Sequence, residues 1–204
     1  MVKVMSMRVR ILAGIVGLLA LTGAASAAPI TYIATGSGSG TLDGAAFGSL
    51  APLSFTITGI GDTANVVSCG GGCIFNDNLS ANISIAGLGT FDFVTTTRFF
   101  ASGIAIGFSR SGSGGADLYD GLAGPYDLIS NYGPVFGTLS LIQWSNSPVV
   151  TDGGVLVFNS AQTSGSFQAI TGAAEVPEPL TMSLFGAGIV GVAALRRRKK
   201  TANA

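Results

Sequence analysis

Short runs in which apolar and polar residues alternate recur through the middle of this 204-residue chain. A repeat of two residues places every second side chain on the same face of a β-strand, and long helical periodicity is absent. The pattern therefore predicts strands with one buried face. The apolar positions of these runs are Leu53, Phe55 and Ile57; Ile83 and Ile85; Phe91 and Phe93; Ile104, Ile106 and Phe108; and Leu139 and Leu141.

Three further segments complete the predicted set of strands. Residues 30–34 begin the set, and Phe167 and Ala169 end it. Residues 155–158 are apolar without interruption, which is typical of a strand that is buried on both faces.

Glycine-rich segments separate these strands and predict turns. Asp152-Gly153-Gly154 favours a hairpin, whereas residues 117–130 are the least strand-like stretch and indicate a long loop or a short helical turn. Short strands with frequent turns predict an all-β fold, an antiparallel sandwich or jelly roll of roughly ten strands. The glycine-rich segments are residues 36–40, 59–62, 70–72, 87–89, 112–115 and 152–154.

The N-terminus has the layout of a secretory signal peptide. Positive residues precede an apolar run over residues 11–21, and Ala25-Ser26-Ala27 is a small-residue cleavage site. We expect export through the secretion translocon and cleavage by signal peptidase after Ala27, because Pro29 would be a poor first residue after the cut. The alternative is an uncleaved N-terminal anchor, which the short apolar run disfavours.

The C-terminus combines an apolar run over residues 180–195 with a block of cations. A helix of that length spans roughly 24 Å, and snorkelling of Arg196 can help it to cross a ~30 Å hydrocarbon core. We therefore expect one transmembrane helix, with the basic tail over residues 196–204 in the cytoplasm and the preceding domain outside it. A buried core helix is the alternative. The cations are Arg196, Arg197, Arg198, Lys199 and Lys200.

Val176-Pro177-Glu178-Pro179, the apolar run and the basic end together resemble the PEP-CTERM sorting signal of Gram-negative bacteria. The resemblance implies recognition by an exosortase, a membrane-embedded cysteine protease that removes the tail near the motif. It also implies an inner-membrane-anchored intermediate, followed by the cell surface or the exopolysaccharide matrix. The chain then divides into a signal peptide (1–27), an exported β-domain (28–175) and a sorting signal (176–204). A Gly/Ser/Thr-rich pattern over residues 36–66 is similar to one in other PEP-CTERM proteins without assigned activity, so it leaves the function open.

Charge is distributed unevenly along the chain. Between residues 28 and 175 the only cations are Arg98 and Arg110, against nine acidic residues, which gives a net charge of −7. Such a domain will not bind nucleic acid or anionic lipid by electrostatics. The acidic surface is either simply solvated or attracts divalent cations.

The chain contains no histidine. This excludes Ser–His–Asp and Cys–His catalysis within the chain. The remaining enzymatic option is a pair of carboxylates, as in glycosidases, but no pair can be assigned from the sequence. We therefore predict no catalytic residues.

Two cysteines, Cys69 and Cys73, flank three glycines. In an oxidising envelope two cysteines usually pair, and the glycines give the backbone freedom to bring the sulfur atoms together. We expect a structural disulfide. The alternatives are a redox-active pair, for which no neighbouring cation lowers a thiol pKa, and half of a metal site.

Two groups of residues could form a binding site. Asp117, Asp120 and Asp127 are a weak candidate for holding Ca²⁺, although their spacing matches no known calcium loop and they could equally cap turns. Tyrosines and a tryptophan could form a platform that stacks against sugars, or could be divided between core and surface. The aromatic residues are Tyr119, Tyr126, Tyr132 and Trp144.

The leading hypothesis is an exported, non-enzymatic protein of the envelope or the exopolysaccharide matrix, without a cofactor. A carbohydrate- or calcium-binding surface module is the alternative. A hydrolase built on two carboxylates is a third reading.

Overall fold

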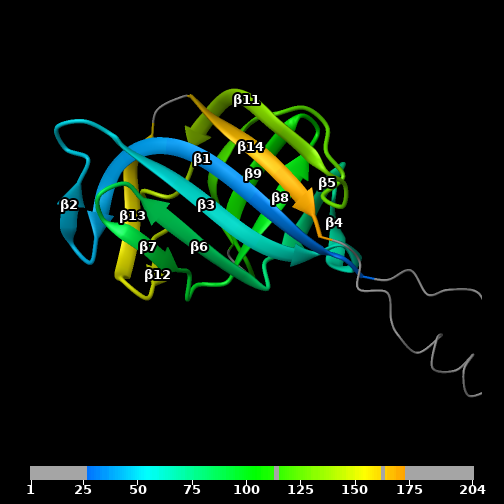
Figure 1. Ribbon diagram of the computed structural model, residues 1–204, viewed down its shortest axis with the longest axis horizontal. Coiled ribbons are helices and arrows are strands. Elements are labelled where there is room, and N and C mark those ends of the chain that lie inside the picture. The colour runs from blue at the N-terminus through cyan, green and yellow to red at the C-terminus, as the bar shows by residue number, and fades with distance from the viewer. Residues whose placement is uncertain (1–26, 113–114, 162–163, 173–204) are drawn as a thin grey trace, which may run out of the picture. The chain divides into compact units, whose positions relative to one another are not determined.

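Fourteen strands and one 3-10 turn make up the part of the chain that the computed structural model describes, which is residues 27–112, 115–161 and 164–172 (Figure 1). The predicted all-β, antiparallel class is confirmed. Residues 1–26 of the predicted signal peptide and the predicted membrane helix over residues 180–195 lie outside the described residues. No helix among the described residues has the length and hydropathy needed to span a bilayer.

The elements follow one another along the chain with short connections. They are β1 (Pro29–Leu42), β2 (Ala45–Phe47), β3 (Leu53–Asp62), η1 (Thr63–Asn65), β4 (Val66–Gly70), β5 (Cys73–Asp77), β6 (Ser80–Ile85), β7 (Gly89–Asp92), β8 (Thr97–Ser102), β9 (Ala105–Arg110), β10 (Asp117–Leu122), β11 (Tyr132–Leu141), β12 (Val149–Thr151), β13 (Gly154–Ala161) and β14 (Ser164–Thr171).

The longest strand, β1, organises the sheet. Along one edge, residues 30–35 pair with β14 and residues 38–42 pair with β13. Along the other edge, β1 pairs with β3 and then with β2. In Figure 1, β1 accordingly runs between β14 and β3.

The strands form one hydrogen-bonded path that folds back on itself. Its order is β4-β5-β8-β9-β10-β11-β14-β1-β3-β6-β7, with β2, β12 and β13 attached beside it. The path has two halves, one from β4 to β10 and the other from β14 to β7. Strand β11 joins them, because it pairs with β14 through residues 132–138 and with β10 through residues 139–141. Aromatic rings from the two halves pack against each other. The ring centroids of Tyr32 and Phe99 are 5.0 Å apart, and those of Phe55 and Tyr119 are 5.4 Å apart.

The core fills the space where these halves face each other. Several residues that the alternation predicted to be inside are buried in it, among them Phe55, Ile57, Ile83 and Ile85. Ile106, Phe108, Phe167 and Ala169 are buried as well, whereas Ile104 lies in a turn and is 57% exposed. The period-two pattern thus located the core face of most strands.

The prediction of a strand buried on both faces over residues 155–158 is wrong. Leu156 and Phe158 are fully buried, but Val155 is 42% exposed. Strand β13 therefore buries one face only, as its neighbours do. An apolar residue on the exposed face of an antiparallel strand made the run look continuous.

The predicted turn over residues 36–40 is also wrong, because this segment is the middle of β1. A β-carbon on Gly36 would lie 2.4 Å from Tyr119 Oη, and one on Gly40 would lie 2.0 Å from the Val157 carbonyl oxygen. The glycines therefore allow close packing against the strand rather than a reversal of the chain. Residues 59–62 likewise belong to β3.

Other turn predictions are confirmed. The chain turns between β4 and β5, between β6 and β7, and at residues 152–153 between β12 and β13. The stretch over residues 117–130 is only partly a loop: its first part forms β10, and the rest is a loop. Leu118 and Tyr119 are both buried because the register shifts between Asp117 and Tyr119, and this shift removed the alternation from the sequence.

Candidate functional site

The predicted processing residues lie at or beyond the ends of the described region. The sorting motif, the basic block and Ala25 are outside it, and Ala27 is its first residue. The ends of the described region are neighbours, because Ile30 pairs with Thr171 and the N–H of Gly172 donates to the Pro29 carbonyl at 2.7 Å.

The predicted disulfide is confirmed. Cys69 and Cys73 are bonded at the tip of the β4–β5 hairpin, with their Cα atoms 5.1 Å apart. Gly70, Gly71 and Gly72 all have positive φ, between 60° and 86°. Only glycine adopts such a run readily, so the composition of this loop follows from its geometry.

The three aspartates of the calcium hypothesis lie on two elements. Asp117 and Asp120 are on β10, and Asp127 is in the loop before β11. Among the described residues, no three His, Cys, Asp or Glu side chains gather closely enough to hold a metal ion. Burial, and then the charge of Asp117, raises the pKa of Asp120.

The carboxylate of Asp127 organises its own loop. Its Oδ1 accepts hydrogen bonds from the N–H groups of Ile129 and Ser130, both at 3.0 Å, and its Oδ2 accepts from Ser130 Oγ at 2.6 Å. Partial burial alone would raise the pKa of Asp127, but the hydrogen bonds from Ser130 and Ile129 hold it below its ordinary value. The carboxylate thus stabilises the loop in its charged form.

The four predicted platform residues separate into two groups. Trp144 is fully buried, and its Nε1–H donates to the Leu156 carbonyl at 3.3 Å. Tyr119 is also buried and donates to the Thr35 carbonyl. A single platform of all four side chains is therefore not formed, and only Tyr126 and Tyr132 line a recess at the surface.

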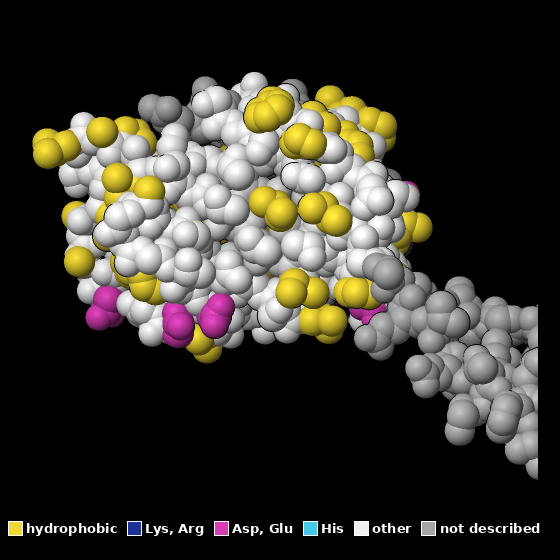
Figure 2. Space-filling model, in the orientation of Figure 1, with side chains coloured by type: hydrophobic (Ala, Val, Ile, Leu, Met, Phe, Trp, Pro, Cys, Tyr) yellow, Lys and Arg dark blue, Asp and Glu magenta, His cyan; other side chains and the backbone are white. Residues whose placement is uncertain are grey.

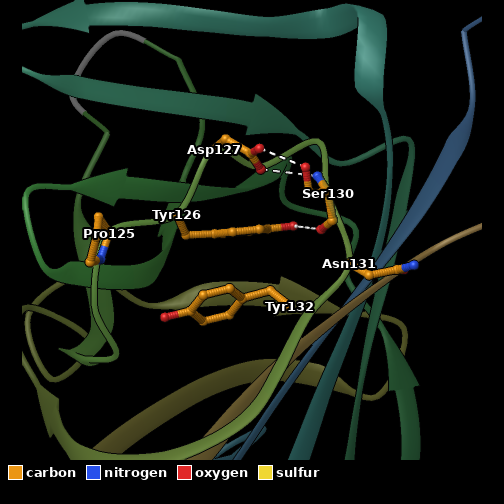
Figure 3. Close-up of a pocket in the computed structure, with 6 residues that line it drawn as sticks. All are labelled: Pro125, Tyr126, Asp127, Ser130, Asn131 and Tyr132. Atoms are coloured by element: carbon orange, nitrogen blue, oxygen red, sulfur yellow. Dashed lines mark hydrogen bonds between the residues drawn. The ribbon is translucent and has the colours of Figure 1, made fainter.

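This surface recess, which we call the tyrosine recess, has a volume of about 360 Å³ and is shown in Figure 3. The rings of Tyr126 and Tyr132 lie one above the other, with centroids 4.7 Å apart, and Tyr126 also packs 5.7 Å from Phe167. The core therefore supports both rings from behind. The lining residues are Pro125, Tyr126, Asp127, Ser130, Asn131 and Tyr132.

Hydrogen bonds fix the positions of these side chains. Tyr126 Oη donates to the Ser130 carbonyl at 2.7 Å, and Tyr132 Oη donates to the Ala123 carbonyl. Asn131 Oδ1 accepts from both the N–H and the Oγ1 of Thr171, which ties the recess to the end of β14.

The tyrosine hydroxyls are therefore committed to the backbone. Burial, ahead of the neighbouring Tyr32 and Asp127, raises the pKa of Tyr126, so its phenol stays neutral. Neutral rings whose hydroxyls are hydrogen-bonded to the backbone offer apolar surface for stacking, and Asp127, Ser130 and Asn131 supply polar atoms beside them. This combination suits a small ligand with an apolar face and hydroxyl groups at its edge, such as a sugar ring.

Sequence reasoning pointed to the two tyrosines and to Asp127 but missed Ser130 and Asn131. The spacing of Asp127 and Ser130 carried a signal, because an aspartate commonly accepts hydrogen bonds from residues two and three positions later. The contact of Asn131 with Thr171 joins residues 40 positions apart and left no local trace.

A family model for the PEP-CTERM protein-sorting motif matches residues 175–199. The match includes Val176-Pro177-Glu178-Pro179, the apolar run and the first four cations of the tail. The chain therefore carries this motif, as the sequence resemblance predicted. The motif implies export, membrane-associated sorting and processing by an exosortase-type protease. Comparison with curated proteins and with solved structures found no match.

Proposed function

We propose that this chain is a non-enzymatic protein of the cell envelope or the exopolysaccharide matrix, delivered there through its PEP-CTERM signal. The observation that carries the proposal is the sorting motif at residues 175–199. The signal-peptide pattern that ends at Ala27 supports it, because both ends of the chain then specify export.

The proposed route has two cleavages. The secretion translocon exports the chain, and signal peptidase removes residues 1–27. The helix over residues 180–195 holds an inner-membrane-anchored intermediate, with its cations in the cytoplasm. An exosortase-type protease then cuts near the sorting motif and frees the β-domain for the cell surface or the matrix of a Gram-negative bacterium.

In this proposal the domain catalyses no reaction and has a structural role where it is delivered, and it works without a cofactor. The absence of histidine from the sequence supports this reading. The carboxylate-hydrolase alternative needs two acids that face one substrate.

The test replaces Val176, Pro177, Glu178 and Pro179 together by alanine in a host that carries an exosortase. We expect the variant to remain in the membrane fraction with its tail intact, while the wild-type protein is released. A Thr201→Ala/Asn203→Ala variant, changed outside the motif, controls for general effects at the terminus. Release of the alanine variant at the wild-type rate would contradict the proposal.

A second candidate function is carbohydrate binding at the tyrosine recess. The observation that favours it is the supported pair of rings, Tyr126 and Tyr132, beside the polar atoms of Asp127 and Asn131. In this role the domain would hold matrix polysaccharide after it has been sorted.

A matched pair of variants tests this function by calorimetric titration with a neutral oligosaccharide, cellotetraose. Tyr126→Leu removes the ring and should weaken binding about tenfold, since loss of a stacking contact costs roughly 1–1.5 kcal/mol. Tyr126→Phe keeps the ring and should bind nearly as the wild type does. Equal affinity of all three folded proteins, or no binding of the sugar, would rule the recess out as a neutral-sugar site.

A further inference from the structure

Hydroxyl groups form a row on the outer face of the sheet. Thr35 of β1 pairs with Ser166 of β14 and with Thr56 of β3, and the row continues through Ser84 of β6 to Thr90 of β7. Residues that are paired directly in antiparallel strands point to the same side of the sheet. The residues that alternate with them are buried, so the row faces away from the core. These buried residues are Ala34, Phe55, Ile57, Ile83, Ile85 and Phe167.

The row ends beside an exposed aromatic ring. Phe136 of β11 pairs with Ser166, and its side chain is 79% exposed. Of the large apolar side chains that are exposed in the described part of the chain, it is the only aromatic one. The next row along the same strands includes two amides and a hydroxyl, those of Gln168, Asn82 and Thr58. An aromatic ring can cover the apolar face of a sugar while such polar neighbours reach its hydroxyl groups.

This face carries almost no charge. The strands β1, β3, β6, β7, β11 and β14 contain no lysine or arginine, and their only acids, Asp62 and Asp92, are the last residues of β3 and β7. In Figure 2, the middle of the surface over β1 and β3 accordingly shows neither acidic nor basic side chains. Between residues 28 and 175 the chain has two cations and nine acids. An uncharged face on such a domain suits a neutral ligand, whereas an anionic ligand or a second copy of the domain is repelled.

Most hydroxyls of the row are available to a ligand. Thr35 and Ser166 share a hydrogen bond of 2.7 Å between their hydroxyl oxygens. The hydroxyls of Thr56, Ser84 and Thr90 form no hydrogen bond with another described residue. Because neighbouring strands lie about 4.8 Å apart, the hydroxyls repeat at that spacing and the row from β14 to β7 is roughly 19 Å long. A regular row of this length is suited to a ligand that itself repeats.

We propose that this face, which we call the hydroxyl face, binds a single chain of neutral polysaccharide that lies across the strands. Phe136 stacks on one sugar ring, and the hydroxyls of the row exchange hydrogen bonds with the sugars that follow. The spacing of the strands is close to the length that one hexose adds to an extended glycan chain, so successive sugars meet successive strands. The inference rests on the proposed delivery to a polysaccharide matrix, and it names one ligand class and one surface there.

The experiment measures calorimetric binding of cellohexaose to the exported protein, with cellobiose as the short reference sugar and tetragalacturonate as the anionic one. We expect cellohexaose to bind at least about tenfold more tightly than cellobiose, because only the longer chain reaches from the aromatic ring along the row. Tetragalacturonate should bind at least about tenfold more weakly than cellohexaose. Raising sodium chloride from about 50 to about 300 mM should leave the affinity for cellohexaose unchanged, since no charge pair contributes to it.

Two matched pairs of variants assign the binding to the hydroxyl face. Phe136→Ala should weaken cellohexaose binding about tenfold, whereas Phe136→Tyr keeps the ring and should bind nearly as the wild type does. Thr56→Val removes one hydroxyl at almost constant volume and should weaken binding about fivefold, whereas Thr56→Ser keeps the hydroxyl and most of the affinity. Thermal unfolding checks that each variant folds. If Phe136→Ala fails to fold, the two Thr56 variants carry the test.

Two further variants control for changes elsewhere. Leu50→Ala also removes an exposed apolar side chain, but from the segment between β2 and β3 outside the hydroxyl face, and it should leave the affinity unchanged. Tyr126→Leu alters the tyrosine recess and should retain the preference for cellohexaose over cellobiose. A preference that is lost in Tyr126→Leu and kept in Phe136→Ala would assign the binding to the tyrosine recess and overturn the inference.

Other results would overturn it as well: no binding of cellohexaose, equal binding of cellobiose, or folded Phe136→Ala and Thr56→Val variants with wild-type affinity. A dimer in sedimentation that dissociates in Phe136→Ala would assign the face to a second copy of the domain instead. Failure of sorting would show itself separately, as an uncleaved tail on a protein whose binding is intact. Absence of binding in a correctly sorted protein would reject the hydroxyl face and leave the proposed function standing.

Discussion

The surroundings of Asp127 and of Asp120 shift the pKa of the carboxyl group in opposite directions. Asp127 accepts three hydrogen bonds within its loop, which lower its pKa, whereas Asp120 accepts none that the described residues reveal and has a raised pKa because it is partly buried. The charged form is favoured at the first position and disfavoured at the second. Each predicts a different response of stability to pH.

Asp127→Ala should lower the free energy of unfolding by roughly 1 kcal/mol and the melting temperature by about 3 °C, because the loop loses its hydrogen-bond acceptor. The contribution of a carboxylate with a lowered pKa is present above its ordinary value of 3.8 and is lost as the pH falls through the lowered pKa. Melting curves from neutral to acid pH measure this. Asp127→Asn keeps Oδ1 and should retain most of the stability but lose its pH dependence. Identical melting curves for the wild type and Asp127→Ala would show that the Asp127 carboxylate does not stabilise its loop.

Asp120→Asn should raise the melting temperature at neutral pH. A carboxyl with a raised pKa costs stability when it is charged, and this cost is absent below the ordinary value of 3.8 and fully present above the raised pKa. The advantage of the variant should therefore disappear as the solution is acidified, which the same melting series detects. A variant that is no more stable than the wild type at neutral pH would show that the burial of Asp120 has no cost.

At the scale of elements, the β4–β5 hairpin is a small unit closed by its own disulfide. Strand β4 ends the hydrogen-bonded path and has a neighbour on one side only, β5. The bond between Cys69 and Cys73 therefore limits fraying of the edge strand β4 at the hairpin tip.

The Cys69→Ser/Cys73→Ser variant should be less stable by roughly 2 kcal/mol, the amount expected for closing so short a loop. For a domain of this size the loss corresponds to a fall of about 6 °C in melting temperature. Thermal unfolding followed by circular dichroism checks this. Reductant should lower the melting temperature of the wild type and leave the serine variant unchanged. A wild-type protein that is insensitive to reductant would contradict a stabilising disulfide.

Elements were predictable from sequence where the signal was local. Alternation located most buried faces, and Gly70-Gly71-Gly72 marked a real turn because all three residues require positive φ. The errors came from packing across the fold. Gly36 is a strand residue because a distant ring, Tyr119, occupies the space above it, and nothing near Gly36 in the sequence records that contact.

At the scale of the whole molecule, the parts of the chain that direct sorting were the most predictable. The motif, the apolar run and the cations are contiguous, so their pattern can be recognised without a fold. The tyrosine recess was not predictable in this way. Trp144 and Tyr132 have similar side chains, yet one is in the core and the other lines a recess, because burial depends on strand pairing between distant segments.

In the proposed role, the chain works as a β-domain freed from its sorting signal. The most direct measurement is the intact mass of the exported protein, produced in a host that contains an exosortase, together with the sequences of both termini. We expect an N-terminus at Ala28 and a C-terminus near the motif at residues 176–179. A tail that remains intact to Ala204 would identify a stable membrane-anchored protein and would contradict delivery to the matrix.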